Sequence, residues 1–162
     1  MQKLPNCSHC FVCGDANASG LGLRFITDGD RVQTTFTPTE PQMGFRGITH
    51  GGILATLLDE TMGWAPVLLS GKFCVTLELT VQYLKPVSIG TEVTVSGWVT
   101  ADRRRAWETA GEVKDAAGEI YAKARGLFVR MSDEDSRKTL DFLIFDDGCV
   151  PPHQILRSSS VP

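Results

Sequence analysis

The sequence predicts an α+β domain in which an antiparallel β-sheet wraps around a single long helix. One apolar run with helical character covers about residues 51–67. Two strand-like runs precede it and four follow it, and the sequence contains no internal repeat. A lone buried helix among six strands leaves the sheet as the only large surface that can cover it.

Length and composition are those of an ordinary soluble domain. The 162 residues are enough for one compact unit with a sizeable core, and 42% of them are hydrophobic and 22% charged. The net charge of −3 provides no general attraction to nucleic acid or to an anionic membrane. No apolar run has the length of a membrane span, and residues 1–6 lack the core of a signal peptide. We therefore expect a cytoplasmic protein with neither nucleic acid nor membrane as a partner.

The first segment, residues 1–19, is notable for its cysteines. Cys7, Cys10 and Cys13 are three of the five cysteines in the chain, and His9 lies among them. A cytosolic protein keeps such thiols reduced. Structural zinc sites usually combine two separated ligand pairs, and no second pair follows here. The spacing therefore favours a cysteine-containing turn without a metal or other cofactor, and a zinc-bearing interaction protein is the alternative.

The next segment, residues 20–131, contains the regular elements. Residues 20–26 and 32–36 read as strands joined by a hairpin turn, and residues 38–49 read as a loop. The helix is expected from about Gly51 to about Val67, because Pro66 and Gly71 mark its end. Its apolar residues cover nearly all of its circumference, so it is expected to be buried rather than laid on a surface.

Period-two patterning begins at residue 73. Val75, Leu77, Leu79, Val81 and Tyr83 fall on one face of the expected strand, while Thr76 falls on the other. Further strands are expected over residues 92–100, 106–114 and 119–131. The last segment, residues 132–162, reads as an extension with a short amphipathic helix and a tail containing Ser158–Ser160. No chemistry is assigned to this extension.

The helix start carries the most informative residues. His50, Gly51 and Gly52 lead into the apolar run, which then presents Asp59 and Glu60. A helix N-terminus exposes unpaired backbone N–H groups that suit an anionic oxygen, and paired glycines let a ligand approach them. The imidazole and the carboxylates add groups that can move protons. Together these residues supply the parts of an acyl-transfer site.

Residues 10–131 resemble the hotdog-fold thioesterases of the small acyl-coenzyme A group, which includes phenylacetyl-coenzyme A thioesterases. The resemblance rests on the His50-Gly51-Gly52 helix opening, on Asp59 where that family keeps its catalytic carboxylate, and on Thr76 where relatives carry Ser or Thr. The hairpin ending at residues 118–124 is also typical. The chain lacks the family's usual Asn upstream of His-Gly-Gly, having Gln-Met-Gly-Phe-Arg-Gly at residues 42–47. The group that would hold the attacking water is therefore left open.

The resemblance implies a thioesterase that needs no cofactor and whose substrate is an acyl-coenzyme A. Asp59 would act as general base or as nucleophile, and the Gly52 amide would donate to the thioester oxygen. His50 would orient the loop or polarise the carbonyl, and Thr76 would position either the water or a carboxylate oxygen. The remaining candidates are substrate-contacting residues, namely Gly51, Tyr83, Arg103 and Arg104.

Helix geometry adds an expectation about assembly. Gly52 and Asp59 lie seven residues apart, or about 10 Å along a helix axis, which is too far for one carbonyl to touch both. If both act on one thioester, they come from different chains across a two-fold interface. We therefore expect a homodimer, or a dimer of dimers. Glu60 points about 100° away from Asp59 on the helix, so a solvated or cross-subunit structural charge is favoured.

Two other functions compete with hydrolysis. Hotdog 3-hydroxyacyl dehydratases and enoyl-thioester hydratases also combine a His with a helical acid. Their His lies in a Phe-Pro-Gly loop, and this pattern is absent here. A non-catalytic acyl-coenzyme A binding module usually carries a DNA-binding helix pair, for which residues 1–19 are too short.

Overall fold

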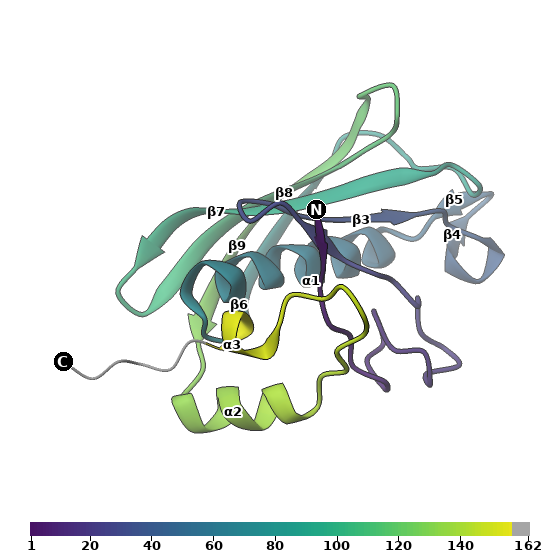
Figure 1. Ribbon diagram of the computed structural model, residues 1–162. Helices are drawn as coiled ribbons and strands as arrows, with labels where there is room; N and C mark the ends of the chain where they lie inside the picture. The colour runs from purple at the N-terminus through teal and green to yellow at the C-terminus, as the bar shows by residue number, and fades with distance from the viewer. Residues whose placement is uncertain (157–162) are drawn as a thin grey trace.

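The computed structural model describes residues 1–156, and shows one antiparallel sheet of seven strands wrapped around helix α1 (Gly51–Ser70) (Figure 1). The predicted fold class is therefore confirmed in outline, whereas the predicted tail at Ser158–Ser160 lies outside the described residues. The sheet has the strand order β1-β2-β3-β7-β8-β9-β6. Its strands are β1 (Gln2–Lys3), β2 (Ile26–Thr27), β3 (Val32–Phe36), β6 (Cys74–Tyr83), β7 (Val93–Arg103), β8 (Ala106–Lys114) and β9 (Ile120–Arg130).

The segment before α1 differs from its predicted form at two places. Residues 20–26 were expected to be a strand, but only Ile26 and Thr27 pair, because Gly22 adopts a φ of 62° that breaks extended backbone. The expected loop at residues 38–49 contains a 3₁₀ turn, η1 (Glu40–Gln42), and a small hairpin. That hairpin consists of β4 (Met43–Phe45) and β5 (Ile48–Thr49).

Helix α1 begins where predicted and ends three residues later than expected. It continues through Pro66, although proline removes one hydrogen bond from a helix interior. Trp64 and Val67 on either side of this proline are buried, so tertiary packing offsets that loss. The helix stops at Gly71, whose φ of 68° and N–H bond to the Val67 carbonyl form a left-handed cap.

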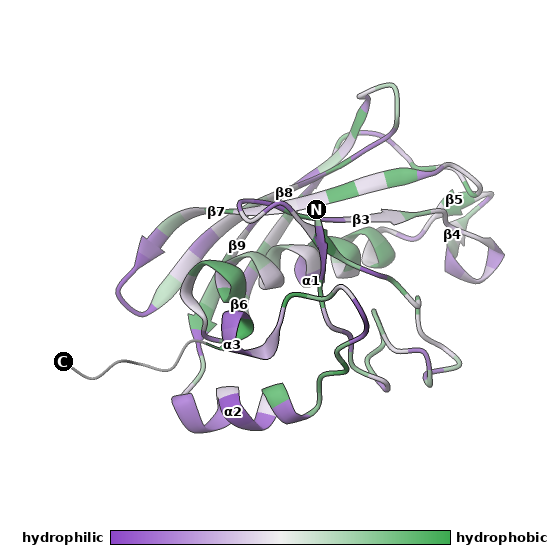
Figure 2. Cartoon of the chain, viewed as in Figure 1, coloured by the Kyte–Doolittle hydropathy of each residue, from purple (hydrophilic) through white to green (hydrophobic). Residues whose placement is uncertain are grey.

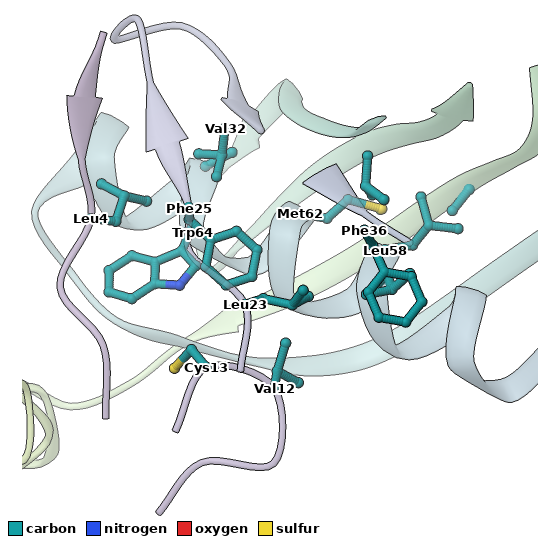
Figure 3. Packing of buried hydrophobic residues seen from close by; sticks show 14 of the residues in the cluster. Leu4, Val12, Cys13, Leu23, Phe25, Val32, Phe36, Leu58, Met62 and Trp64 are labelled. Atoms are coloured by element: carbon teal, nitrogen blue, oxygen red, sulfur yellow. The ribbon is translucent and has the colours of Figure 1, made fainter. Parts of the chain in front are cut away.

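The sheet holds α1 closely because small residues lie beneath it. A Cβ on Gly97 of β7 would lie 2.8 Å from the Cα of Met62 and 2.8 Å from the Thr61 carbonyl oxygen. Only glycine allows this approach of helix backbone to strand backbone. Met62 and Leu58 are fully buried in the resulting core, where Figure 3 shows them beside Phe36. Hydrophobic and hydrophilic residues alternate along the long strands that enclose this core (Figure 2).

Strand β6 lies at one edge of the sheet and pairs only with β9 among the described strands. Its pairing register shifts between Thr76 and Glu78, so Leu77 is the extra residue of a β-bulge. Before the bulge Cys74 and Thr76 face α1, and after it Leu79 and Val81 pack on the core. The prediction that one face of β6 is apolar along its whole length is thus wrong, because the bulge exchanges the helix-facing and outward-facing positions of the strand.

The segments near the two ends of the described chain pair with each other, and in Figure 1 the C-terminal one lies below α1. Isolated bridges join Lys3 to Cys149 and Asn6 to Ile144. The C-terminal segment begins with α2 (Asp133–Asp141), whose first turn is capped by the Ser132 hydroxyl accepting the Asp135 N–H. A one-turn helix, α3 (Pro152–Ile155), follows. Among the described residues, no helix has both the length and the apolarity to cross a membrane.

Candidate active site

The start of α1 is organised by His50. As the residue preceding the helix, His50 accepts the Gly52 N–H on its Nδ1 at 2.9 Å and so fills one of the unpaired donors of the first turn. An accepting Nδ1 means that the ring proton of the neutral imidazole is on Nε2. The Gly52 N–H is therefore engaged by His50, and it becomes a donor to a thioester oxygen only if the imidazole shares or releases it.

Tyr83 lies against the same helix start. Its hydroxyl donates to the Gly51 carbonyl oxygen at 2.8 Å, although the two residues are 32 positions apart. A Cβ on Gly51 would come within 3.3 Å of the Tyr83 ring, so glycine leaves room for the ring to lie this close to the helix. The structure thus brings together four predicted residues, namely His50, Gly51, Gly52 and Tyr83.

Asp59 lies two turns further along α1, and among residues 1–156 its side chain has one hydrogen-bond partner. The Thr76 hydroxyl donates to Oδ1 of Asp59 at 2.8 Å. This is the contact that the second of the two roles expected for Thr76 requires, and the role itself stays a prediction. This contact exists because the bulge at Leu77 turns Thr76 toward the helix. With Oδ1 held by Thr76, Oδ2 is left for a water or a substrate.

Both Asp59 and Thr76 line a cavity of about 420 Å³. Its apolar walls come from α1, from β6 and from a part of the chain to which the sequence assigned no role. Phe142 and Leu143, which follow α2, line the cavity together with Trp64 and Phe73. A volume of this size accommodates a small acyl group beside a carboxylate. Nothing in the local sequence around Phe142 signals this, because the contact depends on the chain returning to α1.

Glu60 also lines this cavity and is only partly exposed, so the prediction of a solvated charge is wrong, whereas the alternative of a cross-subunit structural charge stays a prediction. Burial, followed by the nearby Cys10 and Asp59, raises the pKa of the Glu60 carboxyl to about 7. The N-terminal segment packs against this part of α1 and so withdraws Glu60 from water. The sequence gives only the angle between Asp59 and Glu60 around the helix axis. It does not show which segments of the chain cover each side chain.

Cys10 and Cys13 are the other polar groups of the cavity wall. A hydrogen bond between the two thiols lowers the pKa of Cys10 and raises the pKa of Cys13, which burial raises further. The Sγ atoms of both residues and a carboxylate oxygen of Glu60 all lie within 4.8 Å of one another. In the described chain these three residues are the ones whose donor atoms are close enough to share a metal ion.

The two predicted arginines do not join the site within this protomer. Arg103 pairs with Glu108 at 2.8 Å, and Arg104 occupies the exposed turn between β7 and β8. Neither arginine is among the described residues that line the cavity. Contact of these arginines with a substrate phosphate stays a prediction.

Comparison with known proteins identifies the fold. Residues 46–122 match the family described as Thioesterase superfamily. Acyl-coenzyme A thioesterase THEM4 from Xenopus laevis is 30% identical over 102 residues, which is 62% of this chain and 46% of that protein. The chain spans about half the length of the curated relatives it matches.

Two solved structures are similar over most of the chain. A thioesterase superfamily protein of known crystal structure has a TM-score of 0.68 and 32% identity, covering 75% of this chain and 60% of that one. A hypothetical thioesterase protein from Streptococcus pneumoniae, crystallised with coenzyme A, has a TM-score of 0.58 and 25% identity, covering 64% and 82%. The chain therefore has the hotdog fold.

Proposed function

We propose that this chain hydrolyses an acyl-coenzyme A thioester to a free carboxylic acid and coenzyme A. The observation that carries the proposal is the Asp59–Thr76 pair at the wall of an apolar cavity, within a hotdog fold. The similarity to acyl-coenzyme A thioesterases and to a structure that holds coenzyme A supports this substrate class. The size of the cavity favours a small acyl group, in keeping with the sequence resemblance to the phenylacetyl-coenzyme A type.

In the proposed reaction, Asp59 takes a proton from a water molecule as the water oxygen attacks the thioester carbonyl. The negative charge that develops on the carbonyl oxygen is stabilised by the Gly52 N–H, once His50 shares or releases this donor. Collapse of the tetrahedral intermediate breaks the C–S bond. Asp59 gives its proton to the leaving sulfur, so coenzyme A departs as the thiol. In the alternative route, Asp59 attacks the carbonyl, the C–S bond breaks and coenzyme A leaves as the thiolate, and water then hydrolyses the resulting anhydride to the free acid and the Asp59 carboxylate. Thr76 keeps the carboxylate in place in both routes.

The proposed active unit is a homodimer. Gly52 and Asp59 lie seven positions apart on one helix, so a single thioester reaches both only across two chains. Strand β6 supports an interface on this side of the molecule, because it is an unpaired sheet edge. It also carries exposed apolar side chains: Val75 is 54% and Leu77 65% exposed. We place the activity in the cytoplasm, which suits five unpaired cysteines.

The test is a panel of purified acyl-coenzyme A thioesters of short, long and aromatic acyl groups, with thiol release followed by a thiol reagent. The wild-type chain is expected to release coenzyme A from at least one of them, and Asp59→Asn is expected to lose that activity. Hydration of an enoyl-coenzyme A without thiol release would instead identify a hydratase. Tight binding of the thioesters with no turnover would identify a binding module.

A further inference from the structure

The cysteine-containing turn near the N-terminus comes close to α1 at Glu60. Figure 3 shows Cys13 on this turn, close to the Trp64 ring of α1. Sγ of Cys10, Sγ of Cys13 and a carboxylate oxygen of Glu60 lie within 4.8 Å of one another. Donor atoms around a tetrahedral zinc ion are about 3.5–3.8 Å apart, given bonds of about 2.0–2.3 Å. The three donors are thus close to the separation that a shared cation requires.

Backbone N–H groups of the turn donate hydrogen bonds to both sulfur atoms. The Val12 N–H donates to Sγ of Cys10 at 3.3 Å, and the Cys7 N–H donates to Sγ of Cys13 at 3.4 Å. Such bonds stabilise thiolate, which is the form of cysteine that binds metals. The turn also requires Gly14, where a Cβ would lie 2.5 Å from the Cys10 carbonyl oxygen. The conformation of the loop therefore lets both sulfur atoms accept hydrogen bonds from backbone N–H groups and lie near the Glu60 carboxylate.

The charges around Cys10, Cys13 and Glu60 favour the binding of a cation. The cavity is lined by two carboxylates, those of Asp59 and Glu60, and by Cys7, Cys10, Cys13 and Cys74. No Lys, Arg or His is among its described lining residues. Negative groups gathered in a partly buried, apolar space are costly unless a positive charge offsets them. A bound cation would supply that charge at the point where the three donors meet.

We propose that Cys10, Cys13 and Glu60 form a binding site for a thiophilic divalent cation, with Zn²⁺ the best match. Two thiolates and one carboxylate suit zinc and exclude Ca²⁺ and Mg²⁺, which prefer oxygen donors alone. The fourth coordination position faces the cavity. The cation fixes residues 7–14 to α1, and it neutralises Glu60 next to Asp59. The site goes beyond the proposed thioester hydrolysis and stands whether or not the chain has that activity.

Cobalt(II) provides the direct test, because its spectrum reports its ligands. Protein purified under reducing conditions and stripped with a chelator is titrated with Co²⁺. The wild-type chain is expected to bind one Co²⁺ per chain, with a thiolate charge-transfer band and the visible bands of tetrahedral cobalt, both of which Zn²⁺ displaces. Cys10→Ser and Cys13→Ser are expected to abolish the charge-transfer band. Glu60→Gln is expected to weaken Co²⁺ binding by about tenfold or more.

Cys74→Ser is the matched control, because Cys74 lines the same cavity but its sulfur donates to the Gly63 carbonyl oxygen. This variant is expected to keep the full cobalt spectrum. Zn²⁺ is also expected to raise the melting temperature of the wild-type chain and of Cys74→Ser, but not that of Cys10→Ser. The proposal is overturned if the reduced wild-type chain shows no thiolate charge-transfer band, or if the band survives in Cys10→Ser and Cys13→Ser.

Discussion

Thr76 and Asp59 form a hydrogen bond of 2.8 Å between the edge strand of the sheet and the central helix. The strand reaches the helix in this register only because Leu77 bulges out of the pairing with β9. The bond fixes one carboxylate oxygen of Asp59, a residue that lines the cavity, and leaves the other without a hydrogen bond among the described residues. The chemistry proposed for Asp59 depends on this division of its two oxygens.

Replacement of Asp59 by Asn is expected to lower the maximal rate of thioester hydrolysis by about a hundredfold or more, because the amide is neither a base nor a nucleophile. The two side chains have nearly the same shape, so the fold should survive, and circular dichroism checks this. A folded Asp59→Asn variant with near-normal turnover would remove Asp59 from the mechanism.

Replacement of Thr76 by Val is expected to lower kcat by about ten- to a hundredfold, because it removes a charge-assisted hydrogen bond of about 1.5–3 kcal/mol. KM should change little, since the hydroxyl holds the carboxylate rather than the substrate. Thr76→Ser is the control and should restore most of the rate. Equal kcat for the Val and Ser variants would show that the hydroxyl has no part in the reaction.

Mixed dimers test the proposed sharing of the site. Gly52→Val places a Cβ 2.9 Å from Nδ1 of His50 and fills the space at the helix start, while Asp59→Asn removes the acid. Each homodimer should be nearly inactive. A heterodimer of the two variants has one intact site if the site spans two chains, and should recover about half of the wild-type activity. Continued inactivity, with subunit exchange verified by mass spectrometry, would place the site within one chain.

The thiol of Cys74 is expected to react slowly with iodoacetamide at mildly alkaline pH. Burial, together with the nearby charges of Asp59 and Glu60, raises its pKa to about 12. A raised thiol pKa keeps the unreactive, protonated form across this pH range. Mass spectrometry should show much less alkylation of Cys74 in the folded chain than in urea. Asp59→Asn should increase its rate, and equal rates in folded and unfolded protein would contradict the buried placement.

Replacement of Gly97 by Ala is expected to destabilise the fold by about 3 kcal/mol or more, because the new methyl group meets the backbone of α1 at 2.8 Å. Urea unfolding followed by fluorescence measures this. Thr100→Ala, at an exposed position of the same strand, should change the stability by only a few tenths of a kcal/mol. A fully stable Gly97→Ala protein would mean that helix and sheet are further apart than described.

The sequence alone predicted the elements whose signals are local. The helix start at His50-Gly51-Gly52 and the strand at residues 106–114 are confirmed at the predicted residues, because capping and alternation act over a few positions. The position of Asp59 on a buried helix follows from the same apolar pattern. These features determine the fold class and bring the residues at the helix start together.

Tertiary structure decided what lies around Asp59 and Glu60. A bulge in an edge strand has no reliable signal in the alternation, so the contact between Thr76 and Asp59 could be named only as one of two options. The cavity walls at Phe142 and at Cys10 come from opposite ends of the described chain. Such contacts depend on where distant segments return, and neither spacing nor periodicity records the path of the chain between them.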